Sequence, residues 1–227
     1  MTDIDKPVIE ADIRRWLERA VIGLNLCPFA KSVYAKGQVR IVVSDADHID
    51  DLREELAEEM LHLRDTPAED TDTTLLVLAD VLRDFLDYND FLDDADALLE
   101  SLGLVGVLQV ASFHPDYQFA DTEADDPGNL TNRSPWPLLH ISREESLEKA
   151  VEHYPDVEAM PERNIERMKA LGKSLGDLVN DSTDYRQKLR EAKEKEEQER
   201  CVQMIALKRL SVTASENMDR VHAALVK

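Results

Sequence analysis

The sequence predicts an α/β fold with a small parallel or mixed sheet and flanking helices, followed by a charged helical tail. Short apolar or β-branched runs alternate with long amphipathic segments over residues 8–113, which is typical of strands joined by crossover helices. Two of these runs, Thr73–Ala79 and Leu104–Phe113, are apolar on both faces, as in strands that are covered on both sides. After residue 180 the chain becomes nearly all polar. We therefore expect a single domain over residues 1–180 and a charged helical tail over residues 181–227.

The first part of the chain predicts two helices and a strand. Val8–Leu24 places apolar residues at helical spacing, with charges on the other face. This helix ends before Cys27-Pro28, because a residue that precedes proline is pushed out of the α region. An irregular connection then leads to a β-branched strand at Gln38–Val43. Asp47–Arg64 is the second helix, with its own apolar stripe.

Three further strands and three further helices are predicted beyond residue 72. The strands are Thr73–Ala79, Leu104–Phe113 and a short edge strand at Pro137–Ile141. The helices are Phe85–Leu102, which Gly103 is placed to cap, a helix that Ser142 opens with a capping box, and Pro161–Leu171. The alternative to this α/β arrangement is a ferredoxin-like α+β fold, since a short sheet of this kind can also be two-layered.

Charge limits the partners of the protein. The chain of 227 residues carries a formal net charge of -21. Between Ser44 and Glu100 there are 20 Asp and Glu residues against 3 Arg. Such a surface repels nucleic acid and anionic lipid, so we expect neither as a partner. A solvated acidic face that keeps the protein in solution accounts for the same pattern.

Cysteine usage and the absence of long apolar runs predict a cytoplasmic protein. The two cysteines, Cys27 and Cys201, lie far apart in the sequence, so no disulfide framework is expected. No apolar run approaches the roughly 20 residues of a membrane span. The amino terminus shows no signal peptide, because it has no apolar core segment.

Chemically capable side chains gather in Gly106–Arg143, which begins as a strand and continues as a polar loop. In a parallel sheet, ligands bind beyond the carboxyl ends of the strands, and this loop leaves from such an end. His114 can act there as a general base or metal ligand, because a histidine titrates near neutrality. It can equally cap the strand end through backbone contacts. His140 is either its partner in a catalytic or metal-binding pair or a packed histidine.

The loop between the two histidines supplies candidate substrate-binding groups. Arg133 can clamp a carboxylate or phosphate with two hydrogen bonds, and an internal salt bridge is the competing role in so acidic a chain. Asn129 and Asn132 can orient a substrate or close Asx turns within the loop. Tyr117 and Trp136 either line a pocket or cover the loop.

Cys27 is the third candidate for catalysis, beside the two histidines. Nucleophilic use requires a thiolate, which a nearby histidine or cation stabilises. The alternative is a buried structural cysteine. The sequence leaves both the cofactor and the metal unknown, because the separation of His114 and His140 is no known short ligand spacing.

Several segments together resemble a bacterial family known as DUF1415. They are NLCPFAK (25–31), SFHPDYQFADT (112–122), the pattern N-x-T-N-R-S-P-W-P-x-x-H (129–140), REES (143–146) and PERNIERM (161–168). The resemblance covers about residues 8–172 and leaves the tail outside. It implies a bacterial cytosolic domain and implies no reaction.

Two functions follow as hypotheses. The first is an enzyme acting on a small polar or anionic substrate, with His114, Cys27 and His140 in catalytic roles and the loop side chains binding the substrate. The second is a non-catalytic module that binds a small-molecule ligand or regulates a partner, and that self-associates through its tail.

Overall fold

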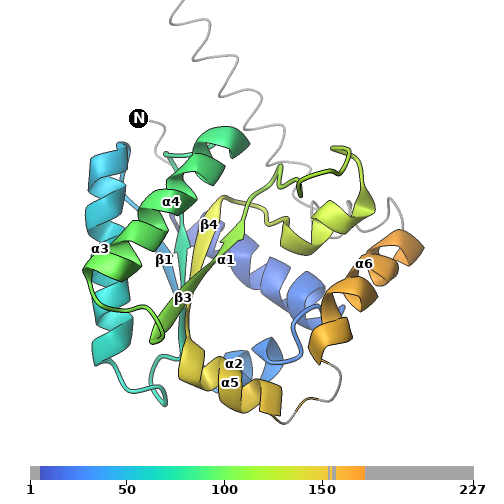
Figure 1. Ribbon diagram of the computed structural model, residues 1–227, viewed down its shortest axis with the longest axis horizontal. Helices are drawn as coiled ribbons and strands as arrows, with labels where there is room; N and C mark the ends of the chain where they lie inside the picture. The colour runs from blue at the N-terminus through green and yellow to red at the C-terminus, as the bar shows by residue number, and fades with distance from the viewer. Residues whose placement is uncertain (1–5, 153, 155–156, 172–227) are drawn as a thin grey trace, which may run out of the picture. The chain divides into compact units, whose positions relative to one another are not determined.

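The computed structural model describes residues 6–152, 154 and 157–171. The tail predicted over residues 181–227 lies outside them. At the centre is a four-stranded sheet in the order β1-β2-β4-β3 (Figure 1). The strands are β1 (Val39–Val43), β2 (Thr73–Val77), β3 (Leu108–Phe113) and β4 (Leu138–Arg143). β1 and β2 pair in parallel, and β4 runs antiparallel to both of its neighbours. The predicted mixed α/β sheet is therefore confirmed, and its parallel pair excludes the fully antiparallel ferredoxin-like alternative.

Two long helices cover the first face of the sheet. They are α3 (Ile49–Asp65), between β1 and β2, and α4 (Phe85–Ser101), between β2 and β3. Both crossovers advance in the same direction across the sheet, so a common hand places both helices on one face (Figure 1). Asp84 caps the start of α4 by accepting from Leu86 N at 2.9 Å, and Gly103, with φ +67°, follows its end as predicted.

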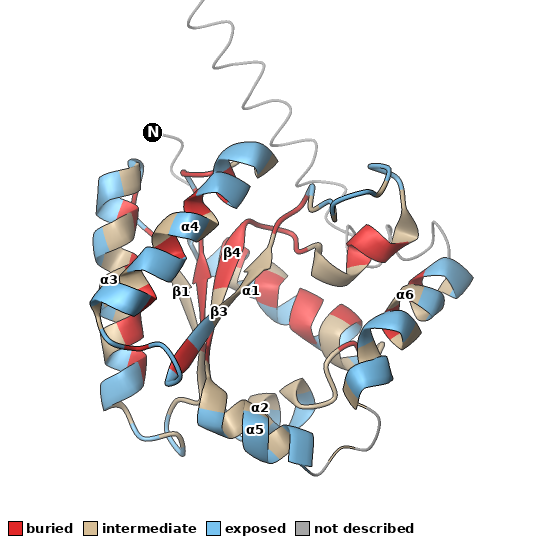
Figure 2. Cartoon of the chain, in the orientation of Figure 1, coloured by how far each residue is buried: buried red, intermediate tan, exposed pale blue. Residues whose placement is uncertain are grey.

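The first face holds the main hydrophobic core. The inward stripes of α3 and α4 pack there on alternate residues of β2 and β4, such as Leu76 and Ile141. Figure 2 shows the same helices exposed on their outer sides, where the acidic residues between Ser44 and Glu100 gather. The predicted stripes of both helices are confirmed.

Shorter segments cover the second face. They are α1 (Lys6–Trp16), the π-helical turn η1 (Leu17–Ile22), α2 (Ala30–Ala35), η2 (Pro127–Asn132), α5 (Glu144–Glu152), η3 (Val157–Ala159) and α6 (Met160–Leu171). α1 and η1 together form the predicted helix Val8–Leu24, and Ile9, Ile13 and Trp16 are buried along it. α2 and α5 have no fully buried residue. This layer is therefore built from pieces too short to pack over the whole sheet face.

The order of the strands corrects two expectations. The prediction that the segment Pro137–Ile141 forms an edge strand is wrong, because β4 lies between β2 and β3. Insertion of β4 leaves β3 at the edge, half-buried along most of its length rather than covered on both faces. β3 also begins at Leu108 rather than Leu104, since Leu104 O accepts from the amides of Val107 and Leu108 in a turn.

Two helix predictions also need correction. The segment before β1 was expected to be irregular, but Ala30–Ala35 forms α2. The capping box expected at Ser142 does not form, because Ser142 is still part of β4 and α5 begins at Glu144. The antiparallel pairing of Ser142 with Thr73 holds that residue in the extended conformation.

Tyr88 of α4 joins the helix layer to the ends of β3 and β4. Its hydroxyl donates to Leu138 O at 2.8 Å and accepts from Phe113 N at 3.0 Å, and its side chain is fully buried. Burial raises the pKa of Tyr88, so the hydroxyl stays protonated.

We expect Tyr88→Phe to lower the free energy of unfolding by about 1–3 kcal/mol in urea denaturation, because Phe113 N loses its partner. Tyr34→Phe is the control on a less buried hydroxyl, and an equal loss in both variants would contradict the assignment.

Candidate functional site

The polar loop lies where the sequence placed it, at the carboxyl ends of β1, β2 and β3. Since β4 is antiparallel, its amino end meets the same edge, and Leu78 N donates to Pro137 O at 2.8 Å. His114 N donates to Asn132 O at 3.2 Å, so the two ends of the loop are in contact. The fold therefore brings His114 next to Asn132.

His114 is enclosed at this edge. It is 0% exposed, and the rings of Phe85 and Tyr88 lie 5.5 and 5.1 Å from its own. Nδ1 accepts from Asp116 N at 3.0 Å, so Nε2 carries the proton of the neutral ring. Nε2 lies near the backbone of Leu82 and Arg83 but makes no hydrogen bond of good geometry within the described residues. Burial lowers the pKa of His114, although the nearby charge of Asp116 acts in the opposite direction. The contacts of His114 are those of a residue that holds the base of the loop.

The asparagines and Arg133 use their polar groups within the loop. Asn129 is fully buried; it accepts from Phe119 N at 3.0 Å and donates to Glu123 O at 2.9 Å. Asn132 Nδ2 donates to a strand carbonyl, Ser112 O. Arg133 donates to the carbonyls of Tyr117 and Ala124 at 3.1 and 2.7 Å. These contacts of the two asparagines join distant parts of the loop and β3 and are not Asx turns, and Arg133 likewise binds backbone carbonyls of the loop.

The aromatic residues of the loop, Tyr117 and Trp136, pack against other side chains of the protein. Tyr117 lies 5.3 Å from Phe85, ring to ring, and Trp136 is 8% exposed with Nε1 3.4 Å from Asp12 Oδ2. Trp16 of α1 donates from Nε1 to Arg133 O at 3.1 Å. Trp16 therefore lies between the polar loop and a separate cavity, which it also lines.

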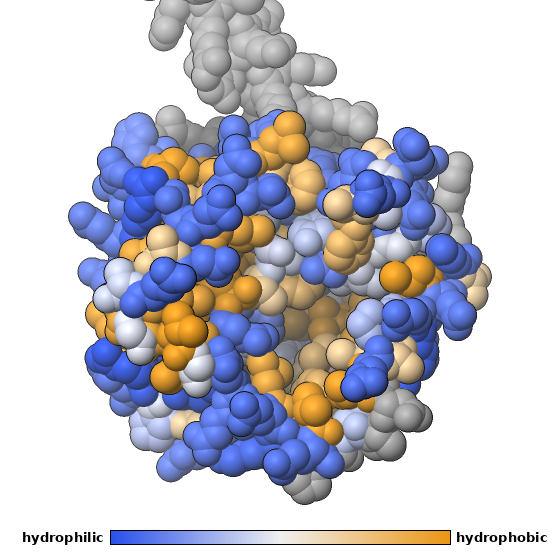
Figure 3. Space-filling model, in the orientation of Figure 1, coloured by the Kyte–Doolittle hydropathy of each residue, from blue (hydrophilic) through white to orange (hydrophobic). Residues whose placement is uncertain are grey.

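That space is a cavity of about 380 Å³ against the second face of the sheet. It lies between the sheet, η1, α2 and α5, and it reaches Val39 and Thr73 at the amino ends of β1 and β2. Figure 3 shows a hollow bordered by apolar residues above α2 and α5. Most of its walls are apolar or aromatic, including Trp16, Val21, Phe29, Val33, Phe113 and Leu147. The short covering segments leave this space, which is within the usual size of small-molecule sites.

His140 and Cys27 are the two predicted catalytic residues that line the cavity. The other predicted site residues, His114 among them, do not line it. Cys27 is a half-buried free cysteine on the segment between η1 and α2. The structure thus divides the predicted site into a loop that bonds to itself and a cavity on the second face.

A hydroxyl group sets the tautomer of His140. Thr73 Oγ1 lies 2.7 Å from Ile141 O, to which it donates its single proton. The same oxygen lies 2.6 Å from His140 Nε2, so it accepts there, and His140 must carry its proton on Nε2. Nδ1 is then an unprotonated acceptor. Burial lowers the pKa of His140 to about 4, which keeps the ring neutral at pH 7.

The depressed pKa of His140 predicts a pH-dependent stability. An unfolded histidine titrates near 6.5, so the unfolded chain binds more protons between that pH and about 4. The effect of His140 therefore leaves the free energy of unfolding unchanged above pH 6.5 and lowers it as the pH falls toward 4. At pH 5.0 we expect His140 to lower the free energy of unfolding by about 2 kcal/mol relative to pH 7.5. Urea denaturation at both pH values should show a correspondingly smaller loss in His140→Phe, whereas the exposed control His48→Phe should behave as the parent protein. Equal losses in both variants would contradict the lowered pKa of His140.

Polar residues that the sequence analysis did not single out also line the cavity. Thr73 and Ser142 lie beside His140, and Ser142 Oγ is buried without a hydrogen-bond partner among the described residues. One signal was present in the sequence. His140 and Ser142 alternate with Leu139 and Ile141, so they share one face of the strand. Two polar residues on one face of an otherwise apolar strand indicate that this face meets a polar group.

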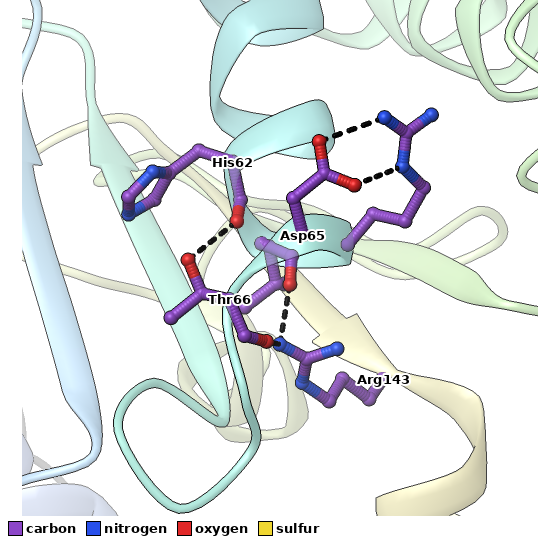
Figure 4. Close-up of polar contacts among 6 residues, drawn as sticks. His62, Asp65, Thr66 and Arg143 are labelled. Atoms are coloured by element: carbon purple, nitrogen blue, oxygen red, sulfur yellow. Dashed lines mark hydrogen bonds and ion pairs between the residues drawn. The ribbon is translucent and has the colours of Figure 1, made fainter.

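Arg143 stands at the rim and anchors α3. Its guanidinium donates to the carbonyls of Leu63, Thr66 and Thr71, at the carboxyl end of the helix and in the following turn. Figure 4 shows the guanidinium reaching the carbonyls at the point where the chain leaves α3. Across the rim, Asp72 accepts from Ser146 Oγ at 2.5 Å. The main polar groups of the rim are therefore engaged with the protein.

The described part of the chain contains no group of three or more His, Cys, Asp or Glu side chains placed to hold a metal ion. None of its helices combines the length and the apolar character that crossing a membrane requires.

The fold and the site define a class: an α/β domain with helices on both sheet faces and an apolar cavity under the shorter helical layer. The chain belongs to the family described as "Protein of unknown function (DUF1415)", whose model matches residues 8–176. The resemblance noted in the sequence is thus confirmed. Comparisons with curated proteins and with solved structures give no match.

Proposed function

We propose that the domain binds a small, largely apolar molecule in the cavity on the second sheet face. One observation carries the proposal: a space of about 380 Å³ has mostly apolar walls and the polar side chain of His140 on one side. Protein interiors rarely keep voids much larger than a water molecule. Ligand sites combine a large apolar surface with a few polar groups that orient the ligand. The apolar walls favour this ligand over the polar or anionic substrate expected from the loop.

A panel of small apolar probes tests the proposal. Toluene and indole, titrated into the full-length protein, should shift the methyl NMR signals of Val21, Val33 and Leu147, which line the cavity. The methyl signals of Leu52 and Leu56, buried on the other face, should not move.

Two matched variants separate cavity binding from surface binding. Ala150→Phe adds a ring to a residue of α5 that lines the cavity, and it should abolish the shifts. Ala97→Phe adds the same ring to an exposed position of α4 and should leave them intact. Absence of shifts in the parent protein, or equal shifts in both variants, would refute binding in this cavity.

Catalysis in the same cavity is a second candidate function. It is supported by the presence of the Cys27 thiol and the His140 imidazole on the walls of one space. The catalytic proposal narrows to these two residues, since His114 lies outside. Transfer of the thiol proton to His140 would have to overcome the desolvation that lowers the pKa of this imidazole. A thiolate formed in this way reacts faster with alkylating agents than an isolated thiol at neutral pH. In a Cys201→Ser background, iodoacetamide should therefore modify Cys27 several times more slowly after His140→Phe. An unchanged rate would remove the catalytic candidate.

Self-association through the tail is a separate proposal. The segment CVQMIALKRL carries apolar residues at Val202, Ile205, Leu207 and Leu210 within a charged region. Removal of all residues after Asn180 should lower the number of chains per particle, which is the molar mass from light scattering at several concentrations divided by the mass of one chain. An unchanged number of chains per particle in the shortened protein would end this proposal.

A further inference from the structure

The polar side of the cavity restricts the chemistry of its ligand beyond size and hydrophobicity. The inference below rests on the proposed function, because it identifies the ligand of the same cavity. It concerns two side chains of β4, His140 and Ser142, which project from the same strand face toward the cavity.

The first of these side chains offers a fixed acceptor. Thr73 holds Nε2 of His140 as the protonated nitrogen, so Nδ1 keeps its lone pair. Within the described residues Nδ1 receives no hydrogen bond, and it is not one of their fully buried unpaired atoms. Nδ1 is therefore reachable from the cavity and needs a donor.

The second side chain does not offer a contact. Ser142 is 5% exposed, and its Oγ is fully buried with no hydrogen-bond partner in the described part of the chain. Because a ligand in the cavity does not reach this oxygen, Ser142 serves as a control residue next to His140 on the same strand face.

Charge on the ligand is disfavoured at this wall. A carboxylate or phosphate has only acceptor oxygens, and these would face the lone pair of Nδ1. His140 cannot easily supply a positive charge, because burial lowers its pKa to about 4. The cation at the rim, Arg143, is already held by the carbonyls of Leu63, Thr66 and Thr71. The rim also carries the carboxylate of Asp72.

We propose that the cavity takes an uncharged aromatic molecule with a hydroxyl head group, which donates to His140 Nδ1. A phenol supplies this donor. The aromatic rings of Trp16, Phe29, Tyr34 and Phe113 on the walls suit a flat apolar body. Thr73 serves as a positioning residue, since it holds the imidazole in the accepting tautomer.

Four probes with one methylphenyl body test the head group. They are p-cresol, toluene, 4-methylanisole and 4-methylbenzoate, titrated into the full-length protein at pH 7.5 and followed by the cavity methyl signals. We expect p-cresol to bind about 3- to 10-fold more tightly than toluene, as one net hydrogen bond allows. The 4-methylanisole cannot donate and should lose this advantage. The 4-methylbenzoate, an anion at this pH, should bind most weakly.

Two variants assign the contact. His140→Phe should remove the preference for p-cresol over toluene while toluene still binds. Ser142→Ala is the control: it removes a hydroxyl that a ligand does not reach, so the protein should stay folded and the preference should be unchanged. A full preference for p-cresol in His140→Phe, or an equal loss of the preference in both variants, would overturn the proposal.

The probes also distinguish the two proposals. If p-cresol and toluene bind equally, and Ala150→Phe abolishes both, the hydroxyl inference is overturned while binding in the cavity stands. If 4-methylbenzoate binds most tightly, the site is an anion site and the inference is again overturned. If none of the four probes binds, the proposed function fails together with the inference.

Discussion

Replacing Asn129 with alanine is expected to lower the free energy of unfolding by about 3–4 kcal/mol. The amide is fully buried and joins three parts of the loop: it accepts from Phe119 N and Thr122 Oγ1 and donates to Glu123 O. Alanine leaves these groups without partners and creates a void. Urea denaturation measures the loss.

A control on the same loop isolates this effect. Gln118 is exposed and donates to Thr122 O, so Gln118→Ala should change stability by less than about 0.5 kcal/mol. Binding of apolar probes to the cavity should survive in folded Asn129→Ala, because Asn129 does not line it. If Asn129→Ala were no more destabilising than Gln118→Ala, the amide would be free to orient a substrate, as the enzyme hypothesis requires.

Arg143→Met is expected to destabilise the protein by about 2–3 kcal/mol. The guanidinium binds carbonyls at the carboxyl end of α3 and in the turn that leads to β2, including Leu63 and Thr71. These contacts are charge-assisted and also place a cation at the negative end of the helix dipole. Methionine preserves much of the apolar stem but supplies no donor. The loss is measured by urea denaturation, and amide hydrogen exchange should accelerate in the turn.

Arg64→Met provides the matched control for this prediction. Arg64 lies at the same end of α3, but its guanidinium pairs with the exposed carboxylate of its neighbour Asp65 (Figure 4). Such exposed pairs contribute little to stability, so Arg64→Met should have little effect. Similar losses in both variants would show that Arg143 acts as a surface charge and not as the anchor of the turn.

Hydrophobic periodicity was sufficient to predict the long helices, because their apolar stripes show which side of each helix is buried. α3 and α4 are long, and their apolar stripes at helical spacing could only face a sheet. Short segments were harder. The prediction that Ala30–Ala35 is irregular failed because six residues provide less than two turns of pattern. Ser142 fits the pattern of a capping box, yet its pairing with Thr73 keeps it in β4.

The candidate site was predictable in part for a similar reason. The sequence identified His140 and Cys27 as chemically capable, and both line the cavity. It could not separate them from His114, because residues far apart in the chain are assigned to one space only by packing. The polar loop looked like a binding site because its side chains are those that bind ligands. The same side chains also satisfy the backbone groups of a long loop.

The sequence by itself determined the α/β class, the two long helices, the acid-rich outer face and the family to which the chain belongs. These features depend on local spacing and composition. Only the tertiary structure decided that β4 lies inside the sheet and that its second face, with His140 and Ser142, borders a cavity. Strand order and cavities arise from contacts between distant segments, and local sequence patterns do not predict such contacts. The same contact between Thr73 and His140 also decided which nitrogen of that histidine is left to receive a ligand.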